Sequence, residues 1–120
     1  SQRKYDAALS ALESAASHIP LRPDIDAAIH YNMGLIHDAR DNIPAALAAF
    51  TKAAESDPFR AETWRKIAYC HLCLGQDVES EGAWNRARNQ DPALPAFTDI
   101  RDLFRQQEPH DRQLEPGTAQ

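Results

Sequence analysis

Apolar and small residues return at the same positions at a fixed interval along the middle of the chain. Trp64 follows His30 at the same interval at which Trp84 follows Phe50. This interval also separates further pairs: Met33 and Ile67, Gly34 and Ala68, His37 and His71, Ala46 and Ser80, Ala53 and Ala87, and Pro58 and Pro92. A fixed period of about 34 residues is typical of stacked helical hairpins. We therefore expect hairpins that bury one another's faces and present an extended surface.

Prolines and turn residues divide this pattern into helices. Because proline lacks the amide hydrogen that a helix interior needs, we expect helices to end before Pro20, Pro58 and Pro92. Turns inside the hairpins are expected at residues 40–42 and 75–77, where Asn42 and Asp77 should cap the helices that follow. The predicted helices span residues 4–17, 25–40, 43–56, 59–74, 77–90 and 95–107.

The residues at the repeated positions resemble those of the tetratricopeptide repeat (TPR) family. In that family the first helix carries an aromatic residue, a Leu-Gly pair and a tyrosine, the second carries an alanine and an aromatic residue, and a proline closes the unit. Residues 27–60 match with His30, Met33, Gly34, His37, Ala46, Phe50, Ala53 and Pro58. Residues 61–94 match with Trp64, Ile67, Ala68, His71, Ser80, Trp84, Ala87 and Pro92. The resemblance implies an all-α fold, a right-handed superhelix of stacked antiparallel helix pairs.

The two ends of the chain should differ from the complete repeats. Residues 1–26 look like the second half of an incomplete repeat followed by a linker. Residues 95–107 place Phe97, Ile100, Leu103 and Phe104 at helical spacing, and we expect a C-terminal capping helix there. Residues 108–120 are almost without apolar side chains, so we expect a mobile tail.

The first predicted helix carries a broad apolar stripe made of Tyr5, Ala8, Leu9, Leu12, Ala15 and Ala16. No preceding helix in this chain is available to cover the outer side of that stripe. We therefore expect self-association through the N-terminal helix, or an upstream helix in the native protein.

Composition narrows the class of protein. A net charge of -5 without a basic patch argues against nucleic-acid binding. The longest apolar stretch, residues 45–50, is far too short to span a membrane, and the N-terminus lacks the apolar core of a signal peptide, so the cytoplasm is the default location unless an export signal has been removed. No phosphate loop, nucleophile elbow, metalloprotease motif or carboxylate pair is present in the sequence, so we expect neither catalysis nor a cofactor.

Cys70 and Cys73 are the residues that most resemble reactive chemistry. Residues three apart on a helix lie about 60° apart around its axis, so the two sulfurs, with His37 or His71, suit a zinc site or a redox pair. Against this, the sequence has no second paired-ligand motif, and buried structural cysteines are common. We favour a packing role without bound metal. The open alternatives are a thiol or zinc site at Cys70 and Cys73, and a docking part of a larger enzyme.

One face of the first helix in each repeat lines a concave groove in the resembling family. A helical wheel places the corresponding residues here opposite the packing positions. They are Tyr31, Asn32, Leu35, Arg65, Lys66, Tyr69 and Leu72. Because two cations adjoin tyrosines and leucines, we predict binding of another protein through an apolar segment with acidic flanks.

This groove lacks the Lys and Asn clamp with which some relatives bind chaperone tails, because Tyr31, Leu35 and Lys66 stand at the clamp positions. The expected role is a scaffold or a chaperone-like holder. Charge reversal on the opposite side, at Lys52 or Arg86, should have little effect on binding.

Overall fold

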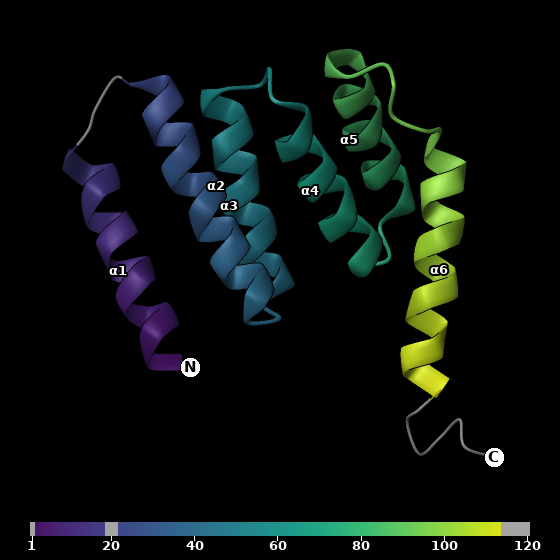
Figure 1. Cartoon of the computed structure of the whole chain (residues 1–120), viewed down its shortest axis with the longest axis horizontal. Coiled ribbons are helices and arrows are strands. Elements are labelled where there is room, and N and C mark those ends of the chain that lie inside the picture. The colour runs from purple at the N-terminus through teal and green to yellow at the C-terminus, as the bar shows by residue number, and fades with distance from the viewer. Residues whose placement is uncertain (1, 19–21, 114–120) are drawn as a thin grey trace.

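The computed structural model of the protein describes residues 2–18 and 22–113, and these form helices and turns without a strand. The six helices in this part of the chain are α1 (Gln2–His18), α2 (Pro23–Ala39), α3 (Ile43–Ser56), α4 (Ala61–Cys73), α5 (Asp77–Gln90) and α6 (Phe97–Gln113). Their order along the chain is also their order along the molecule, which measures 53 × 38 × 19 Å (Figure 1). The predicted all-α class is confirmed.

The most extensive helix contacts join α2 to α3 and α4 to α5. Contacts between α3 and α4 join these two pairs to each other, whereas α1 packs on α2 and α6 rests more lightly on α5. The molecule is therefore a row of two helix pairs with one single helix at each end. None of the described helices combines the length and the apolar content needed to cross a membrane.

Predicted and observed helix ends agree closely, except at the end of α6. This last helix continues to Gln113, so the predicted helix end at residue 107 is wrong, whereas the mobility expected of residues 108–120 stays a prediction. The rest of the expected tail, residues 114–120, lies outside the described residues.

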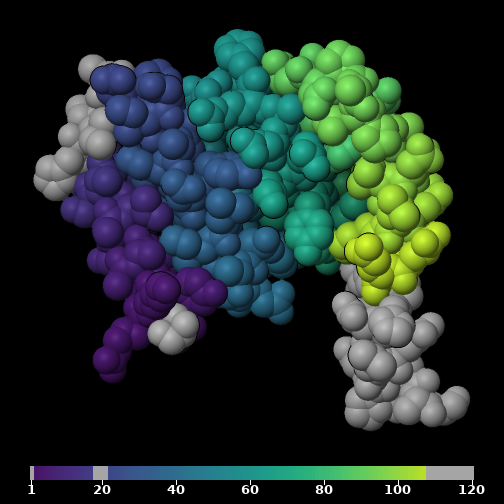
Figure 2. Space-filling view, in the orientation of Figure 1, coloured from purple at the N-terminus to yellow at the C-terminus, as the bar shows by residue number. Residues whose placement is uncertain are grey.

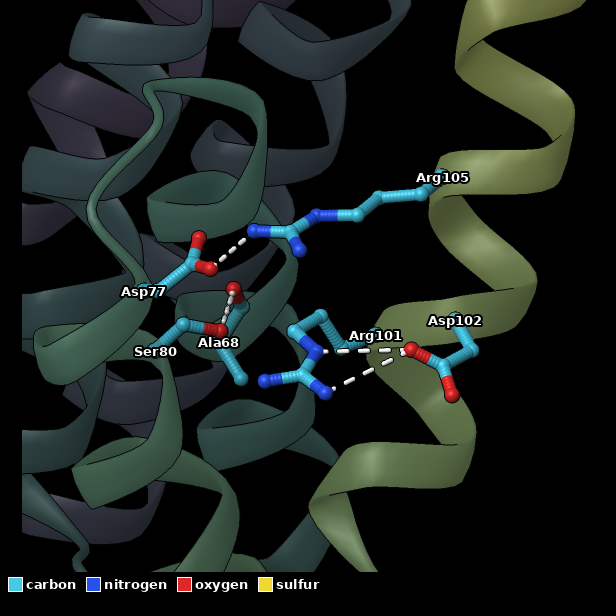
Figure 3. A network of polar contacts seen from close by, with 6 residues as sticks. All are labelled: Ala68, Asp77, Ser80, Arg101, Asp102 and Arg105. Atoms are coloured by element: carbon cyan, nitrogen blue, oxygen red, sulfur yellow. Dashed lines mark hydrogen bonds and ion pairs between the residues drawn. The ribbon is translucent and has the colours of Figure 1, made fainter.

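The two predicted helix caps have different outcomes. Asn42 caps α3, because its side chain accepts a hydrogen bond from the amide of Ala45 at 3.4 Å. The predicted cap by Asp77 is wrong, since the N-cap of α5 is Gln76, which makes no side-chain capping hydrogen bond. Asp77 instead forms an ion pair with Arg105 of α6 (Figure 3). This carboxylate therefore joins the last helix to the preceding pair.

Burial confirms the packing positions that the repeat predicted. Phe50 is 1% exposed and Trp84 is 4% exposed. The small residues at the repeated positions are buried beside them: Gly34, Ala46, Ala53, Ala68, Ser80 and Ala87. Ser80 donates a hydrogen bond to the carbonyl oxygen of Ala68 at 2.7 Å, which satisfies its buried hydroxyl (Figure 3). Small residues thus allow the close helix approaches, and the aromatic rings fill the space between them.

Gly34 should be sensitive to the addition of a single methyl group. A Cβ atom at this position would lie 2.5 Å from Cε1 of Phe50, which is buried and has little room to move. We expect Gly34→Ala to lower the free energy of unfolding by about 1 to 3 kcal/mol through overpacking, measured by urea denaturation.

The matched control for this variant is Gly82→Ala. A Cβ atom on Gly82, an exposed residue of α5, meets nothing within 4 Å. Higher helix propensity should make that variant more stable by about 0.5 to 1 kcal/mol. Equal effects of the two substitutions would contradict the close approach of Gly34 to Phe50.

The apolar stripe of α1 faces the rest of the molecule. Leu9 is buried, and the other members, Tyr5, Ala8, Leu12, Ala15 and Ala16, are half-buried. α1 packs on α2, and an ion pair of 3.0 Å joins Asp6 to Arg40, so one side of the stripe is covered within the chain. A further cover for its outer side, by self-association or by an upstream helix, stays a prediction.

Candidate functional site

A pocket of about 460 Å³ lies among α2, α4, α5 and α6, and we call it the central pocket. Most of its lining comes from the exposed side of α4 and the facing sides of α2 and α6. The lining residues are Tyr31, Asp38, Glu62, Arg65, Lys66, Ala68, Tyr69, Leu72, Trp84, Phe97, Ile100 and Phe104. In the space-filling view, the lower outline of the molecule turns inward between the blue atoms of the first helix pair and the yellow-green atoms of α6, with teal atoms at the top of the recess (Figure 2).

Aromatic contacts shape the walls of the central pocket. The rings of Tyr69 and Phe104 meet edge to face at 5.8 Å and 82°, a geometry that aromatic pairs favour. The ring of Tyr31 lies 5.4 Å from that of Phe50, which anchors this wall to the core. Tyr69 nevertheless stays 43% exposed. The pocket therefore offers an aromatic surface that the fold itself leaves partly open.

Four charged residues line the same pocket, and their formal charges cancel. Asp38 and Glu62 are acidic, and Arg65 and Lys66 are basic. Across the described residues, the arginines in ion pairs are others: Arg22, Arg40, Arg60, Arg101 and Arg105. Within that part of the chain, Arg65 and Lys66 thus reach the pocket without a carboxylate in ion-pair contact.

The pKa values of both pocket tyrosines are raised above that of a free tyrosine. Burial raises the pKa of Tyr31, and the neighbouring carboxylate of Glu62 raises it further. A hydrogen bond with Cys73 raises the pKa of Tyr69, and burial adds to the effect. Each phenol is therefore neutral at physiological pH, and each hydroxyl already has a partner within the fold, Glu62 for Tyr31 and Cys73 for Tyr69.

Five of the seven predicted site residues line the central pocket: Tyr31, Arg65, Lys66, Tyr69 and Leu72. The structure separates the other two from it. Asn32 is exposed to solvent, and Leu35 packs against the core cluster. The helical wheel groups residues over a wide arc, and neighbouring helices cover only part of that arc. Whether any of the seven residues binds a partner stays a prediction.

The sequence analysis does not predict that α6 lines the pocket, because it assigns residues 95–107 to a capping helix alone. Phe97, Ile100 and Phe104 form one wall of the pocket. A usable signal was present, since Ile100 follows Lys66, and Leu103 follows Tyr69, at the interval that separates the two repeats. Extending the period into the last helix predicts that this helix continues the same surface.

The two cysteines lie behind the pocket wall, and no disulfide joins them. Cys70 is fully buried, and burial raises its pKa to about 12. Cys73 is half-buried and contributes the hydrogen bond to Tyr69 noted above. Among the residues whose side chains the structure describes, 2–17 and 22–107, no three His, Cys, Asp or Glu side chains are grouped so that they could hold a metal ion.

The histidines at the repeated positions have different surroundings. The Nδ1 atom of His30 lies 3.0 Å from the carbonyl oxygen of Asp26. The Nδ1 atom of His71 lies 2.7 Å from the side-chain oxygen of Gln76. His37 differs from both, because its buried Nδ1 has no hydrogen-bond partner among the residues that the structure describes.

The raised pKa of Cys70 gives a prediction about thiol reactivity. Because the thiolate is the reactive form, we expect iodoacetamide at pH 8 to modify Cys73 in the native protein and Cys70 only after unfolding. A folded pKa above the unfolded one also means that the contribution of Cys70 to stability is complete below pH 9 and is lost between pH 9 and about 12. Mass spectrometry of the labelled protein checks the order of modification. Equal labelling of both thiols in the native state would contradict it.

Arg86 is unsuitable as a control position for pocket variants, because it contacts Trp64 near the turn between α3 and α4. The guanidinium of Arg86 lies 4.8 Å from the centre of the Trp64 ring, and Trp64 donates a hydrogen bond to the carbonyl oxygen of Pro58. Charge reversal at Arg86 would therefore remove a cation–π contact that contributes about 0.5 to 1 kcal/mol. Lys52 of α3 is exposed and is the cleaner control for pocket variants.

Neither a scan against models of protein families nor a search of curated proteins finds a match for this chain.

Proposed function

We propose that this protein is an interaction module that binds a segment of another protein in the central pocket. The observation that carries the proposal is the half-exposed Tyr69 in an aromatic pocket of about 460 Å³. Cavities of roughly 300 to 1,000 Å³ with apolar walls and a few polar groups are typical binding sites. A volume of this size suits one or two large apolar side chains of a partner.

We also propose that the helix pairs are TPR units, with residues 27–60 and 61–94 as complete repeats and α6 as their cap. The support is the agreement between the period of the sequence and the buried positions, in particular Phe50 and Trp84. Within this proposal, the central pocket is part of the concave surface of the superhelix. Its role is that of a scaffold or a chaperone-like holder.

The charge of the pocket refines the partner expected from the sequence. Sequence reasoning weighed Arg65 and Lys66 and therefore expected an apolar segment with acidic flanks. Asp38 and Glu62 line the same pocket, so its formal charge is zero. Tyr69 still supports an apolar segment in the proposed partner. A pocket without net charge gives no support for acidic residues on both flanks of that segment.

Hydrogen exchange tests this proposed function directly. A partner captured from cells of the source organism is purified and added in excess, and amide exchange is measured for each helix. Binding in the central pocket should slow exchange most in α4 and α6, because these helices contribute most of the lining. Protection confined to α3 or α1 would place the partner elsewhere and overturn the proposal.

A further inference from the structure

The charges of the central pocket follow one another in a fixed order along its length. Both α2 and α4 run from the same end of the molecule to the other (Figure 1). Glu62 lies in the first turn of α4, whereas Asp38 lies in the last turn of α2. Arg65 and Lys66 come one helical turn after Glu62. The two cations therefore lie between a carboxylate at one end of the pocket and a carboxylate at the other.

This order favours a negative charge at one place only. A carboxylate of a bound segment can pair with Arg65 or Lys66 in the middle of the pocket, because neither forms an ion pair with another of the described residues. Further carboxylates on either flank would meet Glu62 or Asp38, and like charges at an interface are unfavourable. The pocket therefore discriminates between one central acidic residue and a run of acidic residues.

An apolar surface continues beside these cations along α6. Ile100 and Phe104 line the pocket, and Leu103, on the next turn after Ile100, is 55% exposed. Residues three apart on a helix lie on neighbouring parts of its surface, so Leu103 extends the apolar wall outward. A partner can thus place a large apolar side chain along α6 while its carboxylate reaches α4.

We infer that the central pocket recognises a peptide segment in which a single Asp or Glu side chain adjoins a large apolar side chain, with no further acidic residue on either flank. This inference rests on the proposed function and replaces the acidic flanks expected from the sequence. The carboxylate belongs to a side chain within the segment. A bound peptide that continues on both sides of this residue fills the whole pocket, from Glu62 to Asp38. A peptide that ended with its C-terminal carboxylate at Arg65 and Lys66 would leave one end of the pocket empty.

A peptide library tests the inference without a known partner. Random peptides are displayed between two constant domains, so that no random sequence ends in a free carboxylate, and are selected for binding to the full chain. Peptides whose binding is lost with Tyr69→Ala report on the central pocket. Among these, we expect enrichment of one Asp or Glu next to Leu, Phe, Tyr or Trp, and depletion of peptides with two or more acidic residues.

Matched variants isolate the contribution of the two cations. The double variant Arg65→Gln, Lys66→Gln should lose the preference for an acidic residue and keep the preference for the apolar one, whereas Lys52→Gln should change neither. In a synthesised peptide, replacing the selected Glu by Gln should weaken binding by about tenfold, because hydrogen bonds to charged groups contribute more than neutral ones. Free and amidated C-termini should bind equally.

Three results would overturn the inference and leave the proposed function standing. They are pocket-dependent peptides without an acidic residue, an acidic preference that survives in the double variant, and binding that requires a free C-terminus. A selection that yields no peptide dependent on Tyr69 would instead contradict the proposed function itself.

Discussion

Replacing Trp84 by alanine should lower the free energy of unfolding by about 3 to 5 kcal/mol, the range typical of large aromatic residues removed from a core. The side chain is 4% exposed, and its indole nitrogen donates a hydrogen bond to the carbonyl oxygen of Pro95 at 2.8 Å. The substitution therefore opens a cavity beside the second helix pair and also leaves a carbonyl before α6 without its partner. A loss of this size is a large fraction of the stability of a small domain.

Urea denaturation followed by circular dichroism measures this effect, since tryptophan fluorescence changes with the substitution itself. Trp84→Phe is the matched control, because it retains one six-membered aromatic ring and removes the hydrogen bond to Pro95. Its cost should be smaller than that of the alanine variant. If Trp84→Ala lost no more stability than the same change at the half-buried Trp64, the account of the core would be wrong.

Replacing Tyr69 by alanine should weaken binding of a partner by about 2 kcal/mol or more while the protein stays folded. The ring is 43% exposed, so its removal costs little of the core, and the contact with Phe104 contributes about 0.5 to 1.5 kcal/mol. Tyr31→Ala should also weaken binding. It is the less clean test, because the ring of Tyr31 packs on the buried Phe50.

Isothermal titration calorimetry with the captured partner measures the change, and a thermal melt of each variant checks folding. Tyr69→Phe retains the ring and should retain most of the affinity, whereas Lys52→Glu on the exposed face of α3 should be neutral. If the wild-type protein and Tyr69→Ala bound the partner with equal affinity, Tyr69 would not be the aromatic anchor of the binding site.

The repeat in the sequence predicted the core well, because close helix packing demands small residues at the same register in each pair. Gly34 with Ala68, and Phe50 with Trp84, are buried as the period requires. The cap assigned to Asp77 failed for a physical reason. Its carboxylate has a competing partner in Arg105, which lies far along the chain and on another helix. A local pattern contains no information about such a contact.

The candidate site was predictable only in part. The helical wheel identified the exposed face of α4, because Arg65, Lys66 and Tyr69 project away from the core on one side of a single helix. It could not separate Leu35, which packs against the core, from Tyr31, which lines the pocket. It also could not place α6 across from α4, since the distance between two helices depends on tertiary packing.

A photo-crosslinking amino acid placed at Leu103 tests the central claim most directly, because this exposed side chain of α6 adjoins Ile100 in the wall of the pocket. The same amino acid at Lys52 reports on the exposed face of α3. The account predicts that the partner crosslinks at position 103 and not at position 52, and that Tyr69→Ala abolishes the product. Crosslinking at position 52 alone, or a product at position 103 that is indifferent to Tyr69, would contradict it.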